Sequence, residues 1–240
     1  MAPIRYVTDE QNEVLEKLGI GERREDLENL SLNSSNEKIF QNYWLIENVK
    51  YNGKTSNYKL KKEVLPAKTQ ESHLEHAVEV GESDFHIPDM PLQFAIMKSI
   101  YSSEDSKQRS EIQSFFKKSY REYWLSSGTS VNYDSKRKDK VSHGVRRDSK
   151  EANIIGKDGF MSNLKDKVFS EVILEEENPI IANEVFNWAT GQDLYIWRFN
   201  SKPKQPDKRV VGSGSGDGGS HVVAGGDPSD QGRCLGVCEE

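Results

Sequence analysis

The sequence predicts an α+β fold, because helix-like and strand-like stretches occupy separate parts of the chain. Apolar residues recur at the three- and four-residue spacing of helices over residues 89–124 and again over residues 162–191. Strand-like runs surround an Asn52-Gly53 turn and reappear from Leu194 onward. We expect residues 1–36 to form an N-terminal helical segment and residues 37–240 to form one larger domain.

The composition argues against a nucleic-acid partner and against a membrane span. The formal net charge is −6, whereas binding to a phosphate backbone needs clustered Lys and Arg. No run of about 18 apolar residues occurs in the chain, so no membrane span is predicted. The first residues hold no apolar stretch typical of a secretion signal.

The first half begins with local signals for a short helix and a strand pair. Thr8 and Gln11 form a capping-box pattern for a helix that ends at Gly19. Residues 39–49 and 58–65 are predicted to pair as strands through Asn52-Gly53. His73 and His76 follow in a polar segment. Their spacing would allow a shared metal, but no further ligand lies near them, so we interpret them as a solvated helix face.

Two apolar helices are predicted next. Asp89 or Met90 caps the first, with Pro91 in its first turn, and Ser103 begins the second. The second carries an aromatic face, which we interpret as core rather than as a ligand-stacking groove. The face is formed by Ile112, Phe115, Phe116, Ser119, Tyr120, Tyr123 and Trp124.

A basic segment over residues 136–147 follows a possible strand at residues 130–133. It contains no interleaved aromatic residues, so a solvated hairpin or loop is favoured over a nucleic-acid contact. His143 has no obvious partner for catalysis. Further on, helices are predicted from Ser162 and from Asn178-Pro179 to Gly191, and residues 194–199 have the apolar character of a central strand.

The stretch from Arg209 to Glu240 differs sharply in composition from the rest of the chain. It holds 9 of the 18 glycines and both cysteines, but no Lys, Met, Phe, Trp or Tyr. Such a composition is typical of a flexible tail. However, short apolar clusters separated by turn signals indicate a run of short strands.

A second property of this stretch concerns its codons. Every residue from Gly212 to Cys238 except Gln231 is of a type that the AAC codon can yield when only its adenines change. The order of the motifs is also informative: a Trp strand at residues 194–199, an Arg209-Val210-Val211 strand, a polar glycine-rich run and a closing Leu235-Gly236-Val237. This order resembles the end of a C-type lectin-like fold of the formylglycine-generating-enzyme type. In particular, it resembles the variable proteins of diversity-generating retroelements.

The resemblance implies a non-enzymatic ligand-binding protein with no cofactor, whose variable region over residues 209–240 contacts a variable macromolecular ligand, for which a protein is expected. Such proteins lie on virions or cell surfaces; neither an oligomeric state nor a ligand identity is predicted. Because so many outward positions are glycine, we expect weak binding by this copy. Val210, Val211, Val222, Leu235, Val237, Trp197 and Arg198 are expected to be frame residues. The candidate binding residues are Gly212, Gly214, Gly216, Asp217, Gly218, Gly219, His221, Val223, Gly225, Gly226, Asp227 and Arg233.

Two other interpretations remain open at this point. In a formylglycine-generating-type oxidase, Cys234 and Cys238 would hold copper, although Cys238 stands where the family has an arginine. A zinc site formed by His221, the two cysteines and an Asp is less favoured. In the other interpretation, an α/β domain ends near Lys208 and a disordered glycine-rich tail follows it.

Overall fold

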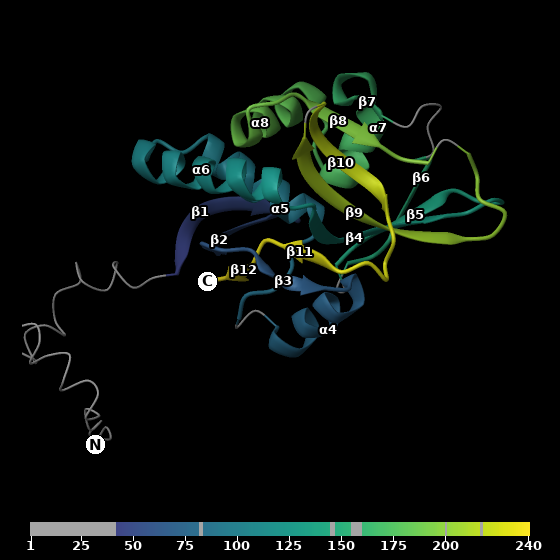
Figure 1. The fold of residues 1–240 in the computed structure, drawn as a ribbon, viewed down its shortest axis with the longest axis horizontal. Coiled ribbons are helices and arrows are strands. Elements are labelled where there is room, and N and C mark those ends of the chain that lie inside the picture. The colour runs from purple at the N-terminus through teal and green to yellow at the C-terminus, as the bar shows by residue number, and fades with distance from the viewer. Residues whose placement is uncertain (1–41, 82–83, 145–146, 155–159, 200, 217) are drawn as a thin grey trace, which may run out of the picture. The chain divides into compact units, whose positions relative to one another are not determined.

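The protein has the mixed α+β architecture that the sequence predicts (Figure 1). The computed structural model describes residues 42–81, 84–144, 147–154, 160–199, 201–216 and 218–240. The predicted N-terminal helical segment and the helix at residues 8–19 lie outside the described residues. The described residues, from Asn42 onward, belong to one compact unit.

A small sheet joins the beginning and the end of this unit. Strands β1 (Tyr43–Tyr51) and β2 (Lys54–Lys61) are antiparallel, and β12 (Val237–Glu239) pairs with the other side of β2. Asn52 and Gly53 both have positive φ, 50° and 73°, as a tight hairpin turn requires. The predicted strand pair is confirmed, but β1 lies a few residues later than expected and β2 lies a few residues earlier.

The larger sheet is built around the glycine-rich C-terminal stretch. Its order is β3-β11-β4-β9-β10-β8-β7, and β5 and β6 extend it beside β4. Strand β10 runs parallel to β8 and antiparallel to β9. The bounds are β3 (Leu65–Lys68), β4 (Leu125–Tyr133), β5 (Asp139–His143), β6 (Lys150–Ala152), β7 (Phe160–Ser162), β8 (Leu194–Trp197), β9 (Asp207–Gly216), β10 (Gly219–Gly226) and β11 (Gly232–Cys234).

The strands predicted in the C-terminal stretch are therefore confirmed. The two long strands β9 and β10 lie side by side in the large sheet (Figure 1). Strand β11 continues the same sheet, and β12 closes the small one. Val210, Val211, Val222, Leu235 and Val237 are all buried. The stretch is an integral part of both sheets, which contradicts the tail interpretation.

Three long helices pack on the domain: α5 (Met90–Tyr101), α6 (Ser106–Glu122) and α8 (Pro179–Thr190). Asp89 caps α5 through its carboxylate, which accepts from the Leu92 amide at 2.8 Å. The predicted start of α6 at Ser103 is wrong, because Asp105 is the residue that caps the free Lys107 and Gln108 amides. Helix α4 (Gln70–Val80) lies against β4.

The single helix predicted from Ser162 is also wrong. The chain there forms a 3₁₀ turn, η1 (Asn163–Lys165), a short helix, α7 (Lys167–Phe169), and a π-helical turn, η2 (Ser170–Leu174). Asp166 interrupts the segment, and its carboxylate caps Phe169. The apolar residues whose spacing predicted one helix are instead distributed over these three short elements.

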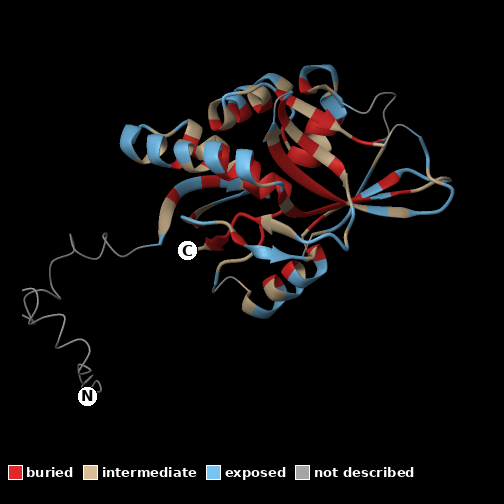
Figure 2. Ribbon diagram, in the orientation of Figure 1, coloured by how far each residue is buried: buried red, intermediate tan, exposed pale blue. Residues whose placement is uncertain are grey.

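The core lies where α5, α6 and α8 meet the large sheet. Phe116, Tyr120 and Phe186 are fully buried, and their rings contact edge to face at 6.1 and 6.3 Å. Figure 2 shows that the side of α6 facing away from the sheet is exposed. Most of the predicted aromatic face is thus core, but Trp124 is 45% exposed. Tyr123 leaves the helical conformation at φ −134° and directs the chain into β4.

Among the described residues, no helix is long and apolar enough to cross a membrane.

Candidate functional site

The alternation of side chains along β9 and β10 divides the C-terminal stretch into two sets. Val211, Ser213, Val222 and Ala224 are completely buried. Between them stand residues that point away from the core. Gly214 is paired with His221, and Gly212 with Val223. Because neighbouring strands keep the same alternation, these outward residues form one continuous surface.

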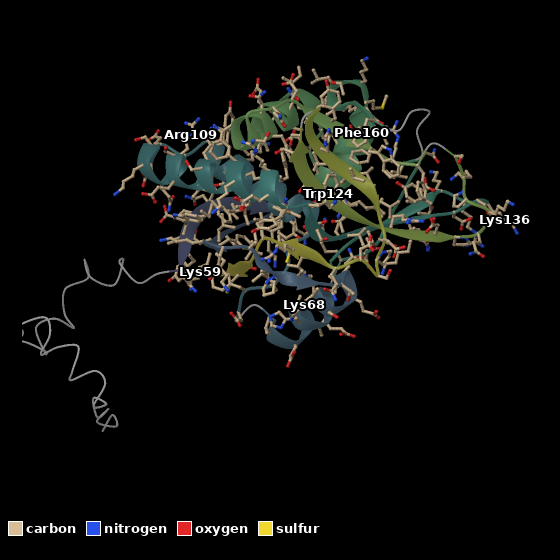
Figure 3. The ribbon with its side chains drawn as sticks, viewed as in Figure 1. Lys59, Lys68, Arg109, Trp124, Lys136 and Phe160 are labelled. Atoms are coloured by element: carbon tan, nitrogen blue, oxygen red, sulfur yellow. The ribbon has the colours of Figure 1, made fainter. Side chains whose placement is uncertain are left out.

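Two further strands extend this surface with aromatic side chains. His221 is paired with Tyr195, Val223 with Trp197, and Trp197 in turn with Phe160 on β7. We call the surface formed by the outward residues of β7, β8, β9 and β10, together with Trp124, the outward face. Phe160 is 54% exposed, and its ring lies 4.8 Å from that of His221. Figure 3 labels Trp124 and Phe160, which belong to opposite ends of this face.

The glycines of the outward face lie under these rings. A Cβ on Gly212 would stand 2.6 Å from Trp124 Nε1, and one on Gly214 would stand 2.7 Å from Trp124 Cε3. Tyr195 covers Gly219 in the same way, at 2.7 Å, and Trp197 covers Gly225. Glycine lets a neighbouring ring lie flat on the strand, where it shields the backbone. The aromatic rings therefore supply the contact area that the glycines lack.

The predicted site residues do not all come together. Gly216 and Gly218 are exposed at the end of the β9–β10 hairpin, and Asp217 between them lies outside the described residues. Gly226 and Asp227 lie at the opposite end of β10. Hydrogen bonds from the Ser229 amide and hydroxyl hold the pKa of Asp227 below its usual value.

Arg233 lies away from the outward face. It belongs to β11, which β4 and β9 separate from β10. Its guanidinium lies 4.8 Å from the centre of the Tyr123 ring, a distance at which a cation–π interaction is favourable. Trp197, which was expected to belong to the frame, lies on the outward face and is only half-buried. Arg198 is buried and paired with Asp166.

The sequence alone did not predict that Trp124, Tyr195 and Phe160 belong to the outward face. Strand alternation could have identified Tyr195, because it is two residues before Trp197 and therefore on the same side of β8. Trp124 and Phe160 carry no local signal, since their place depends on how distant strands pair.

His73 and His143, to which no role was assigned from the sequence, are both buried. His73 lies on α4, not on a solvated face, and its Nε2 donates to the Gly232 carbonyl at 3.1 Å. His143 Nε2 donates to the Val172 carbonyl at 2.9 Å, so its Nδ1 accepts from the Thr129 hydroxyl at 3.0 Å. Burial lowers the pKa of both imidazoles, and both therefore favour the neutral form.

The environment of Cys234 does not resemble that of a reactive cysteine. Its Sγ lies 3.7 Å from both ring nitrogens of His73, and Cys234 packs in a small buried cluster with Leu65, Ala77 and Ile87. Burial raises the pKa of the thiol, whereas a nucleophile or a copper ligand acts as the thiolate. Cys238 is also buried, and its Sγ lies 3.3 Å from the Glu239 carbonyl oxygen. In the described part of the chain, no three His, Cys, Asp or Glu side chains are grouped for a metal ion.

Comparison with models of protein families, with curated proteins and with solved structures found no match.

Proposed function

We propose that the protein is a non-enzymatic binding protein that presents the outward face to a macromolecular ligand, and that a retroelement diversifies its C-terminal stretch. The observation that carries this proposal is the separation of frame and display residues along β9 and β10. Val222 and Ala224 are buried in the core, whereas His221, Val223 and Gly225 alternate with them on the opposite side. A surface of this kind can change while the core stays the same.

A C-type lectin-like frame is the second part of the proposal. Three features support it: a Trp-bearing strand, β8, an Arg-Val-Val strand, β9, and a closing strand, β12, that starts one residue after Gly236. They occur in the order that the sequence resemblance requires. Helices α5 and α6 pack against the strands, as the frame also requires.

The ligand we propose is a protein, bound through aromatic anchors. Trp and Tyr supply large contact areas while losing few rotatable bonds, which is why they dominate binding hot spots. Trp124 and Phe160 are the most exposed rings of the outward face, and Tyr195 and Trp197 are half-buried between them. Weak binding by this copy stays a prediction, and in this proposal the rings rather than the glycines supply the contact area.

Diversification of the C-terminal stretch by a retroelement is tested by sequencing the DNA around the gene. The proposal predicts a reverse transcriptase gene beside a near-copy of the 3′ end of this coding sequence, with the two copies differing only at adenines of the near-copy. Differences spread equally over all four bases, or confined to codons of buried residues such as Val222, would contradict it.

Binding is tested with two matched libraries of the full chain on a display system. One library varies Gly216, Gly218, His221, Val223 and Asp227, and the other varies Val211, Val222, Ala224, Leu235 and Val237, all with codons ending in C. We expect most members of the first to remain protease-resistant and to yield binders to unrelated proteins. These binders should lose affinity on Trp124→Ala but not on Val78→Ala, an exposed position on α4. Equal survival of both libraries, or binders indifferent to Trp124→Ala, would overturn the proposal.

A further inference from the structure

A cationic cleft of about 590 Å³ lies apart from the outward face. It is bounded by the β1–β2 turn, one side of α5, the segment at Arg147–Lys150 and the residues that follow η2. None of its lining residues belongs to the outward face. We call it the cationic cleft because of its charged residues: Lys50, Lys54, Lys98, Arg147 and Lys150, against Glu175 and Glu176.

Both carboxylates of the cleft already have cationic partners. Glu176 accepts from Lys98 at 2.6 Å, and Glu175 accepts from Arg147 at 2.5 Å and from Lys150. Burial alone would raise the pKa of Glu175, but these two partners hold it below its usual value. Lys50 and Lys54, by contrast, make no ion pair with any residue that the structure describes. The cleft thus carries an excess of positive charge in an acidic protein.

Arg147 is fixed at the boundary of the cleft. Its Nη1 lies 3.5 Å from both Asp89 Oδ2 and the Tyr51 hydroxyl, and its guanidinium is 5.3 Å from the Tyr51 ring centre. Burial opposes its charge, but the hydrogen bond to Glu175 and the charges around it raise the pKa of Arg147. A guanidinium held in this way is positioned before any ligand arrives, so little entropy is lost on binding.

Glu175 is the residue that ends η2. It is in the left-handed region at φ 55° and ψ 35°, and its amide donates to the Ser170 carbonyl, an arrangement that is common where a helix ends. Here the conformation places the carboxylate between Arg147 and Lys150, which orients both cations at the cleft.

Four apolar residues also line the cleft, and we call them the apolar wall: Pro91, Phe94 and Ala95 on α5 and Leu174 at the end of η2. Ala95 is half-buried, whereas the other three are buried. A ligand that fits both the cations and this wall has an anionic group and a small uncharged body. A volume of this size suits a small molecule, since ligand pockets are typically about 300–1,000 Å³.

We propose that the cationic cleft binds a phosphate monoester, with the phosphate near Lys50, Lys54 and Arg147 and the rest of the molecule against α5 at Ala95. This site is independent of the outward face and of the function proposed for it. Lys and Arg are the residues that bind phosphate most strongly, Arg through its planar fork and Lys as a mobile charge.

The test is titration calorimetry of the full chain at constant ionic strength with three probes: adenosine monophosphate, inorganic phosphate and adenosine. The test variant is Lys50→Ala/Lys54→Ala, at two exposed positions whose loss does not disturb the core. The matched control is Lys136→Ala/Lys138→Ala, which removes the same charge from an exposed turn outside the cleft.

We expect adenosine monophosphate to bind more tightly than inorganic phosphate, and adenosine alone to bind least. The test variant should weaken binding of the monophosphate at least tenfold, since charge-assisted hydrogen bonds are lost, while the control keeps the affinity of the unmodified chain. Equal affinities for phosphate and the monophosphate would overturn the role of the apolar wall. Equal losses in both variants, or no saturable binding of any probe, would overturn the site.

Discussion

Trp197 lies so close to Gly225 that a Cβ on the glycine would come within 1.7 Å of Trp197 Cζ3. The two residues belong to parallel neighbours, β8 and β10, and both stand on the outward face. The ring can keep its position only because residue 225 has no side chain. A change in the C-terminal stretch therefore alters the surface by two routes, by its own side chain and by moving an aromatic ring that belongs to another strand.

Replacement of Gly225 by alanine should displace the Trp197 ring. Overpacking of this kind typically costs about 1–3 kcal/mol, so we expect Gly225→Ala to lower the unfolding free energy by that amount. Trp197 should become more exposed, with a red-shifted tryptophan emission. Urea denaturation followed by fluorescence measures both quantities.

Gly216→Ala is the matched control for this change. A Cβ on Gly216 meets no atom within 4 Å, so the stability should change by less than about 0.5 kcal/mol. The double variant Gly225→Ala/Trp197→Ala should recover part of the loss, because the second change removes the clash. Identical effects of Gly225→Ala with and without Trp197 would contradict the contact.

The division of β10 into two faces can be tested at adjacent valines. Val222→Asn should lower the unfolding free energy by about 3 kcal/mol or more, since Val222 is completely buried and the amide would be buried among apolar side chains. Val223→Asn, on the half-buried outward side, should cost less than about 1 kcal/mol. Asparagine is the residue that the unmutated AAC codon encodes. Similar costs at both positions would contradict the division into two faces, and a larger cost at Val223 would mean that the strand is shifted by one residue.

The buried His143 predicts a loss of stability at mildly acidic pH. Burial, more than any charge, lowers the pKa of His143 below its usual value, although Asp89 and Glu175 act in the opposite direction. In the unfolded chain the imidazole titrates near about 6.5. The stability that the neutral imidazole provides is therefore fully present above this pH, and it decreases as the pH falls towards the folded pKa.

His143→Gln should reduce this pH dependence. Glutamine can still donate to the Val172 carbonyl and accept from Thr129, but it cannot take up a proton. We expect the unfolding free energy of the variant to fall less steeply than that of the unmodified chain between pH 7.5 and 5.5. His73 and His221, whose pKa values are also lowered by burial, should preserve part of the slope. Parallel profiles for the two proteins would show that His143 is not the titrating group.

Local chemistry was sufficient to predict the parts of the fold that depend on neighbours in sequence. Asn52-Gly53 formed the expected turn because both residues tolerate positive φ, and Asp89 and Asn178 capped helices as their short polar side chains suggest. The strands of the glycine-rich stretch were predictable from the spacing of Val210-Val211, Val222-Val223 and Leu235.

Features that depend on distant contacts could not be predicted. His73 is buried because α4 packs near Gly232, 159 residues further along the chain. Trp124 continues the apolar spacing of α6 in the sequence, but it does not lie on the buried side of that helix. The helix has already ended at Tyr123, whose backbone is extended. The cationic cleft draws its residues from four separate segments, so no single stretch of sequence carries its signal.

Trypsin cleavage at Lys208 or Arg209 would separate a flexible tail from a globular domain, if the chain had such a tail. Lys208 and Arg209 lie in β9, where their backbone pairs with Asn132 and Val131 of β4. Proteases need an extended segment free of such pairing, so trypsin should leave this site intact in the folded protein. The exposed turn at Lys136–Lys138 offers the same residue types and should be cut first.

A chain that ends at Lys208 should fail to fold. It lacks most of β9 and all of β10, β11 and β12, and with them the buried side chains of Val211, Val222, Leu235 and Val237. Each buried valine or leucine contributes roughly 1.5–3 kcal/mol, so this loss matches the whole stability of a typical domain, about 5–15 kcal/mol. Circular dichroism of the truncated chain measures the outcome. A cooperative thermal transition at the temperature of the intact protein would mean that the C-terminal strands do not stabilise the fold, and the outward face would then have no rigid support.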